Sequence, residues 1–200
     1  ASALKNTNGV DWSMDLGDGV MGVGQITYLH EQQSGDTGLP GTYYLGAFYA
    51  GDDYARLDGT GGHGPNHEET GNYGFYAMAQ QMIYREGGAK SSEGLTPWLV
   101  LAVQPGEDIN EIPFMIGAGA LYEGLLPGRE TDITGFAVYH GTYSDDVQDA
   151  SAETVIELNY TLWATPWLGI TPDFQYIFNP KGDSDRSDVA VLGVQVMVNF

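Results

Sequence analysis

The segment that decides the fold is 189–200, with the sequence VAVLGVQVMVNF. Its even positions are apolar throughout and end in an aromatic residue: Ala190, Leu192, Val194, Val196, Val198 and Phe200. Its odd positions after Val189 mix apolar, small and polar residues: Val191, Gly193, Gln195, Met197 and Asn199. A β-strand sends alternate side chains to opposite faces. The segment is therefore predicted to be a strand with one wholly apolar face and one mixed face.

The same alternation runs through the two segments before it. In the first of these, four apolar residues at even positions 156–162 alternate with Glu157, Asn159, Thr161 and Trp163, and the stretch 167–178 repeats the pattern. Glycine and proline interrupt the chain too often for long helices. The fold class is therefore predicted to be all-β and antiparallel. We predict nine strands, over residues 20–30, 41–50, 73–85, 95–104, 112–123, 131–142, 153–164, 167–178 and 189–200.

The composition limits what such a sheet can do. The chain has 200 residues and a mass of 21.6 kDa, which fits one domain or part of one. Its 7 basic and 27 acidic residues give a net charge of −20, which disfavours a nucleic-acid partner because phosphate binding needs clustered Lys and Arg. Cysteine is absent, so disulfides, thiolate zinc sites and Cys nucleophiles are excluded. The sequence contains no apolar run long enough for a transmembrane helix.

Two architectures fit alternating strands. In a soluble barrel or sandwich the apolar face points to a core, whereas in an outer-membrane barrel it points to lipid. Several predicted strands match the roughly 9–11 residues that a tilted strand needs to cross a bilayer. Aromatic residues near strand ends also match interfacial girdles: Tyr28, Tyr84, Tyr122, Tyr176, Phe178 and Phe200. These features favour a transmembrane up-and-down β-barrel, with a soluble β-barrel ligand-binding protein as an alternative.

The predicted connections support the membrane alternative. The breaks after 112–123 and 153–164 are short, and those at 31–40 and 86–94 are of middle length. The others are longer or rich in Asp and Glu, at 51–72, 105–111, 143–152 and 179–188. Short turns at one end and longer loops at the other are typical of a transmembrane barrel.

Several blocks of the sequence resemble one family. The block at the C-terminal end reads TPWL at 165–168 and QYIFNPKG at 175–182, followed by the final strand. Upstream blocks in the same order are LPGTY at 39–43, PGED at 105–108 and GALYEGLLPGR at 119–129, with Asp132 after it. Together they resemble the carbohydrate-selective porins of the OprB type. The resemblance implies a sixteen-stranded barrel in the bacterial outer membrane that passes sugars by facilitated diffusion.

The chain departs from this family in length. Nine strands are too few for the barrel, and family members are roughly twice as long. Bacterial single-chain barrels have even strand numbers, and an open sheet would expose unpaired backbone edges to lipid. We therefore expect residues 1–200 to form a single segment, the C-terminal half of a barrel. The N-terminal half of that barrel is then absent or on another chain. A complete barrel of eight or ten strands is the alternative.

A sugar pathway needs hydrogen-bonding groups and aromatic faces that bind weakly enough for release. The candidate pore-lining residues are Gln104, Glu157, Asn159, Thr161, Trp163, Trp167, Asp173, Gln175, Gln195, Asn199, Arg85 and Arg129. Trp98 is added to them if the TPW repeats at 96–98 and 165–167 share a register. Arg56 and Arg85 are rare basic residues in an acidic chain and are candidates to face carboxylates across the lumen. The alternative role for any of these residues is to solvate the wall, and for Arg129 to stabilise a turn with Asp132.

No catalytic residue, cofactor or metal site is expected. His140, Ser144 and Asp145 are neighbours but lack a nucleophile-elbow motif. The stretch 63–69, with His63 and His67, is not on a predicted helix, so the histidine spacing does not indicate a metal site. As a hypothesis, the acidic loops attract divalent cations, including those that bridge lipopolysaccharide phosphates.

Three functions remain open from the sequence. They are a sugar-selective porin segment, a general diffusion porin of the same fold, and the soluble binding protein. The expected partners of a porin are sugars as transported solutes, outer-membrane lipid and lipopolysaccharide, the other half of the barrel, and a homo-oligomer.

Overall fold

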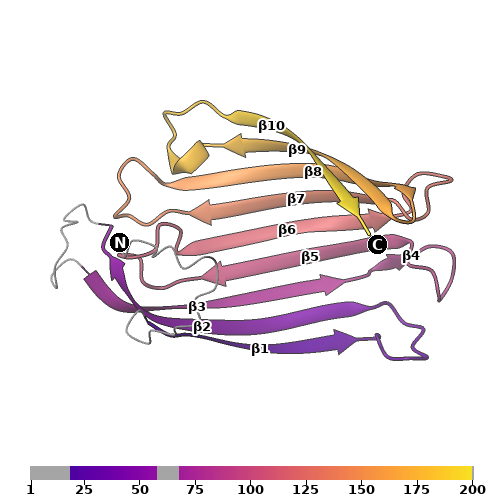
Figure 1. Ribbon diagram of the computed structural model, residues 1–200, viewed down its shortest axis with the longest axis horizontal. Coiled ribbons are helices and arrows are strands. Elements are labelled where there is room, and N and C mark those ends of the chain that lie inside the picture. Colours follow the sequence, from indigo (N-terminus) through magenta and orange to yellow (C-terminus); the bar gives the residue numbers. More distant parts are fainter. Residues whose placement is uncertain (1–18, 58–67, 200) are drawn as a thin grey trace, which may run out of the picture.

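The computed structural model describes residues 19–57 and 68–199, which form one curved antiparallel sheet (Figure 1). Nine long strands lie side by side in chain order, and the two-residue strand β4 pairs with β5. A 3-10 turn, η2, follows β9. The strands are β1 (Met21–His30), β2 (Gly41–Ala55), β3 (Glu68–Gln81), β4 (Tyr84–Arg85), β5 (Gly94–Val103), β6 (Phe114–Glu123), β7 (Ile133–Thr142), β8 (Ala152–Thr165), β9 (Leu168–Phe178) and β10 (Val189–Val198); η2 is Pro180–Gly182.

The all-β antiparallel prediction and the nine long strands are confirmed, and strand bounds differ from the predicted ones by more than two residues only in β2 and β3. The β2–β3 hairpin is longer than expected because pairing resumes after an irregularity between Ala50 and Asp53. The predicted strand 73–85 is interrupted after Gln81, whose side-chain amide donates to the carbonyls of Leu39 (2.9 Å) and Met82 (2.8 Å). These bonds tie the strand end to the neighbouring turn, so Tyr84 and Arg85 form the separate strand β4.

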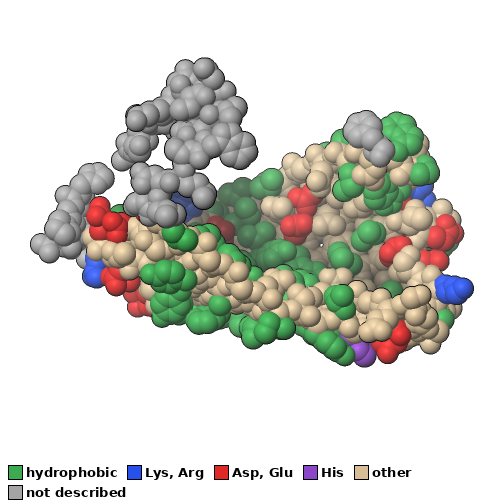
Figure 2. All heavy atoms as spheres, turned by 60° about the horizontal axis from the view of Figure 1, so that its bottom comes forward, with side chains coloured by type: hydrophobic (Ala, Val, Ile, Leu, Met, Phe, Trp, Pro, Cys, Tyr) green, Lys and Arg blue, Asp and Glu red, His purple; other side chains and the backbone are tan. Residues whose placement is uncertain are grey.

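The register gives the sheet an outer and an inner face of different chemistry. Leu158, Phe174 and Leu192 lie opposite one another on β8, β9 and β10, and their exposed fractions are 51%, 40% and 83%. Each other long strand also exposes an apolar side chain on this outer face: Ile26, Leu45, Phe75, Leu99, Ile116 and Phe136. The inner face lines a trough, and acidic side chains are visible in its hollow (Figure 2).

The sheet has almost no apolar core of its own. Among the described residues, the buried hydrophobic side chains are Ala50, Met82 and Ala137. A soluble barrel or sandwich would bury its apolar face, whereas here that face is exposed on every long strand. The exposed face therefore argues against the soluble alternative. No helix in residues 19–57 and 68–199 is long and apolar enough to cross a membrane.

The two ends of the sheet differ more in charge than in loop length. One end, here the turn end, carries the connections 31–40, 82–93, 124–132 and 166–167. The other, the acidic end, carries 56–67, 104–113, 143–151 and 179–188. Only the two-residue turn 166–167 is much shorter than the rest, so the expected contrast in length is weaker than the sequence indicated. The acidic end holds more carboxylates: Glu107, Asp108, Glu111, Asp145, Asp146, Asp149, Asp183, Asp185 and Asp188.

Backbone hydrogen bonds join the connections of the acidic end to one another. The Leu57 N–H donates to the Asp108 carbonyl (2.8 Å), and the Ser144 N–H donates to the Glu111 carbonyl (3.0 Å). The Ser151 N–H donates to the Gly182 carbonyl (2.8 Å). The described parts of these four connections are therefore joined to one another along this end of the trough.

Candidate functional site

Polar side chains gather on the inner face of β8, β9 and β10. Glu157 lies opposite Gln175, and Asn159 lies opposite Asp173. The Glu157 carboxylate accepts hydrogen bonds from the Asn159 amide (2.7 Å) and from the Gln175 amide (3.3 Å). Thr161 Oγ1 lies 3.0 Å from Thr171 Oγ1 on the next strand. We call the inner face of β5 to β10 the inner wall, and this part of it the polar half.

The polar half contains a shallow hollow of about 390 Å³. Its lining includes Asp173, whose Oδ1 atom is buried and has no hydrogen-bond partner. Burying an acceptor without a partner is unfavourable, so a hydroxyl donor that reached this atom would be stabilising. The hollow thus brings together five of the residues predicted from the sequence: Glu157, Asn159, Asp173, Gln175 and Gln195.

The inner face of β5, β6 and β7 carries aromatic rings and small residues, and we call it the aromatic half. Trp98 lies in the same lateral row as Glu157, through Gly119 and Ala137 on the strands between them. The rings of Trp98 and Tyr139 have centroids 5.6 Å apart and an interplanar angle of 37°. The aromatic half thus offers ring surface next to the acceptors of the polar half.

Glycines create the space that these two rings occupy. A Cβ atom on Gly119 would lie 2.6 Å from Trp98 Cζ2, and one on Gly117 would lie 2.5 Å from Tyr139 Cδ1. Real Cβ atoms do not approach so closely. The rings therefore rest against the backbone of β6. Tyr139 was missed by the sequence reasoning, although its odd position among Gly135, Ala137 and Gly141 places it on this face.

Other predicted residues lie outside these two parts of the inner face, near the ends of the sheet. The guanidinium of Arg85 donates to the carbonyls of Thr37 (3.2 Å) and Ala89 (3.0 Å) at the turn end. Trp167 lies in the turn 166–167 with 53% of its surface exposed, and its carbonyl accepts from the Asn199 N–H (2.9 Å). Gln104 lies at the acidic end against Gly74. Arg56 pairs there with Glu69 (2.5 Å).

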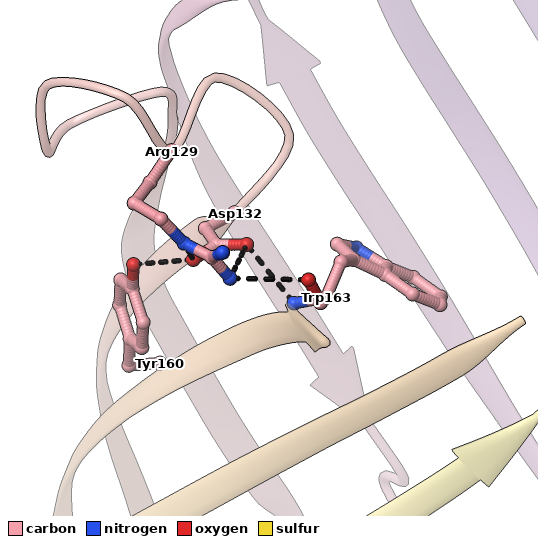
Figure 3. Close-up of polar contacts among 4 residues, drawn as sticks. All are labelled: Arg129, Asp132, Tyr160 and Trp163. Atoms are coloured by element: carbon pink, nitrogen blue, oxygen red, sulfur yellow. Dashed lines mark hydrogen bonds and ion pairs between the residues drawn. The ribbon is translucent and has the colours of Figure 1, made fainter. Parts of the chain in front are cut away.

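At the turn end, the buried carboxylate of Asp132 is the centre of a hydrogen-bonded cluster (Figure 3). Arg129 donates to both carboxylate oxygens, through Nε (2.6 Å) and Nη2 (2.9 Å). The Tyr160 hydroxyl donates to Oδ2 (2.5 Å), and the Trp163 N–H donates to Oδ1 (2.9 Å). Arg129 Nη2 also donates to the Trp163 carbonyl (3.1 Å). The turn-stabilising pair of Arg129 and Asp132 is therefore formed.

The cluster keeps Asp132 ionised despite its burial. Only 1% of its side chain is exposed, and burial by itself disfavours the charged form. Hydrogen bonds from Arg129, Tyr160 and the Trp163 N–H outweigh that effect, so the pKa of Asp132 lies below its ordinary value. At the acidic end, the hydrogen bond from Arg186 (2.9 Å) likewise lowers the pKa of Asp183.

The residues considered for other chemistry do not converge. His140 Nδ1 lies 2.9 Å from Thr154 Oγ1, whereas Ser144 Oγ donates to the Glu107 carbonyl (2.6 Å). His63 and His67 lie outside the described residues. In the part of the chain that the structure describes, no three His, Asp or Glu side chains gather to hold a metal ion. Cation binding by the acidic loops stays a prediction.

Comparison with known proteins identifies relatives of about twice this length. Porin B of Pseudomonas aeruginosa is 26% identical over 229 residues, which cover 100% of this chain and 49% of that protein. The high-pH structure of Pseudomonas putida OprB has a TM-score of 0.85 and 22% identity, and covers 98% of this chain and 52% of that one. The low-pH structure of the same protein has a TM-score of 0.62.

These matches agree with the sequence resemblance. The solved structures share the fold of this sheet, and the chain spans about half the length of each relative. The sequence model of one protein family, the carbohydrate-selective porin OprB family, matches residues 1–200. This chain belongs to the carbohydrate-selective porin OprB family.

Proposed function

We propose that this chain forms part of the wall of a bacterial outer-membrane channel through which sugars diffuse passively. The observation that carries the proposal is the separation of the two faces, one apolar and exposed, the other polar and aromatic. The outer face would contact membrane lipid and lipopolysaccharide, and the inner face would line water. Membership of a porin family supports a channel rather than an enzyme.

The chain would supply one segment of the barrel, the C-terminal half. In the described sheet, β1 and β10 are edge strands, and lipid does not tolerate unpaired strand edges. Because nine antiparallel strands alternate in direction, β1 and β10 run the same way (Figure 1). An odd number of further strands would therefore close this sheet with antiparallel pairing throughout. Seven more strands would give the sixteen that the family resemblance implies.

The chemistry of the inner wall supports sugars as the solutes. The polar half presents carboxylate and amide groups that accept and donate hydrogen bonds to hydroxyls. The aromatic half presents Trp98 and Tyr139 to the apolar face of a sugar ring. Contacts spread over the wall bind a solute weakly, which permits release on the far side.

Sugar flux into liposomes tests this function. The complete porin that contains this chain would be reconstituted, and uptake of radiolabelled glucose would be measured against its concentration. A sugar-selective channel gives uptake that saturates and falls when a second sugar competes. Uptake that rises linearly without competition would instead support the second candidate, a general diffusion porin, which a wall lined by polar side chains also permits.

The assembly needs a separate measurement. We expect detergent-extracted protein to show heat-modifiable migration, and its intact mass to include the second half of the barrel. A particle of 21.6 kDa that stays soluble without detergent would contradict the membrane assignment. The particle mass before boiling also tests for a homo-oligomer.

A further inference from the structure

We infer that the turn end of the inner wall carries a subsite for one neutral sugar ring, with Trp163 as its platform and Asp132 as the residue that positions it. The inference rests on the proposed function, since a sugar must pass this end of the trough. The subsite is separate from the hollow of the polar half. Its lining residues are Thr131, Trp163, Ala164, Thr165 and Pro166.

The pocket has the size and lining that a single sugar ring needs. Its volume is about 470 Å³, within the range of roughly 300–1,000 Å³ that small-molecule pockets occupy. None of the lining side chains is ionised, and two of them, Thr131 and Thr165, carry hydroxyls. Thr165 Oγ1 is buried and has no hydrogen-bond partner. A ligand hydroxyl that reaches this atom would satisfy it.

Trp163 has a fixed place in this pocket. A Cβ atom on Gly169 would lie 3.2 Å from Trp163 Cζ3 and 3.4 Å from Cε3, so the indole packs closely over the backbone of β9. The remaining surface of the side chain lines the pocket. The C–H groups of a pyranose can contact such a ring, while the threonine hydroxyls bond to its oxygens.

The Asp132 cluster determines how Trp163 is aimed. Both backbone polar groups of Trp163 are held, the N–H by Asp132 (2.9 Å) and the carbonyl by Arg129 (3.1 Å). The pairing of β8 with β9 is irregular between Trp163 and Thr165, and such irregularities redirect side chains. The indole points away from Arg129 and Tyr160 (Figure 3). The charges of Arg129 and Asp132 offset each other, so the pocket favours a neutral ring.

The subsite is tested in the complete porin in a planar bilayer. Glucose is added to one chamber at a time, and the concentration that half-blocks the ion current is measured. For Trp163→Ala, we expect the half-blocking concentration from the turn-end side to rise roughly tenfold, with a smaller change from the acidic-end side. Trp163→Phe, which keeps an aromatic ring, should have a half-blocking concentration close to that of the wild type. Phe136→Ala, an aromatic truncation on the outer face of β7, is the matched control and should change little.

The positioning role of Asp132 has its own measurement. Asp132→Asn should raise the turn-end half-blocking concentration, and adding it to Trp163→Ala should cause no further rise. An additive loss in the double variant contradicts positioning. If the wild type transports glucose but Trp163→Ala and Phe136→Ala have the same half-blocking glucose concentration from the turn-end side, the subsite is refuted while the sugar channel stands. If wild type transports no sugar, the proposed function itself is wrong.

Discussion

The aromatic and polar halves of the inner wall use one backbone pattern for two kinds of surface. On β6, Gly117 and Gly119 leave space that large rings from the neighbouring strands fill, so the wall is tightly packed there. On β10, Gly193 faces Asp173, and a Cβ atom would meet it only at 3.7 Å. Glycine is therefore a packing requirement at Gly117 and Gly119 and a spacer at Gly193. Side-chain size on adjacent strands decides which role applies.

The largest effect should come from filling a glycine of the aromatic half. In Gly119→Ala, the new methyl group would collide with the Phe136 carbonyl and the Trp98 ring. A backbone carbonyl cannot move aside as a flexible side chain does, so we expect a loss of roughly 1–3 kcal/mol in stability. This loss is measured from the fraction of protein that still migrates as a folded, heat-modifiable barrel at increasing urea concentration. Gly193→Ala is the control, and an equal loss there would remove the distinction between the halves.

The next effect concerns the cluster that anchors the polar half to the turn 124–132. Asp132→Asn should lower the melting temperature at pH 7, because it removes the charge that Arg129 binds. Since the folded-state pKa of Asp132 is lowered, its contribution is present above the ordinary carboxyl pKa of about 4 and is lost as pH falls through the folded value. Melting curves from pH 7 to pH 2 should therefore converge for the two proteins.

A smaller effect is expected on transport from the aromatic half. Trp98→Ala should raise the glucose concentration of half-maximal uptake about two- to tenfold, since ring contacts contribute roughly 0.5–1.5 kcal/mol. Asn159→Ala in the polar half should raise it less, because its amide already bonds to Glu157 (2.7 Å). The concentrations of half-maximal uptake in liposomes compare the two variants. A larger loss for Asn159→Ala would reverse the assignment of the halves.

The smallest effect concerns charge. Glu157→Gln keeps the size of the side chain but removes one carboxylate from the polar half, so preference for cations over anions should fall, by less than about twofold in 0.1 M salt because of screening. The reversal potential in a KCl gradient measures this preference. Glu123→Gln, at the turn-end terminus of β6, is a comparison in the aromatic half. An unchanged potential in Glu157→Gln would mean that this carboxylate does not face the ion path.

The sequence predicted the polar half better than the aromatic half, for a physical reason. Clean alternation in β8 and β9 placed Glu157, Asn159, Asp173 and Gln175 on one face, and register then brought them together. The Trp98–Tyr139 contact depends on which residue faces each ring across β6, and alternation within one strand does not contain that information.

Residues near strand ends were the least predictable. The predicted strand 73–85 included Arg85, but the hydrogen bonds of Gln81 end β3 before it, and Arg85 pairs with Gly94 as part of β4. Trp167 was assigned by alternation alone, although it lies in a two-residue turn where alternation no longer applies. In both cases a local hydrogen bond or turn overrides the strand pattern. The role of each wall residue in sugar passage stays a prediction.

The matching direction of β1 and β10 limits how this sheet could have arisen or assembled. Two copies inserted in the same orientation would meet with parallel strands at each seam, against the antiparallel pairing of the rest. Tandem duplication of these nine strands would therefore not yield a uniform antiparallel barrel. The nine described strands are not self-complementary, and closing them with antiparallel pairing throughout would take an odd number of further strands.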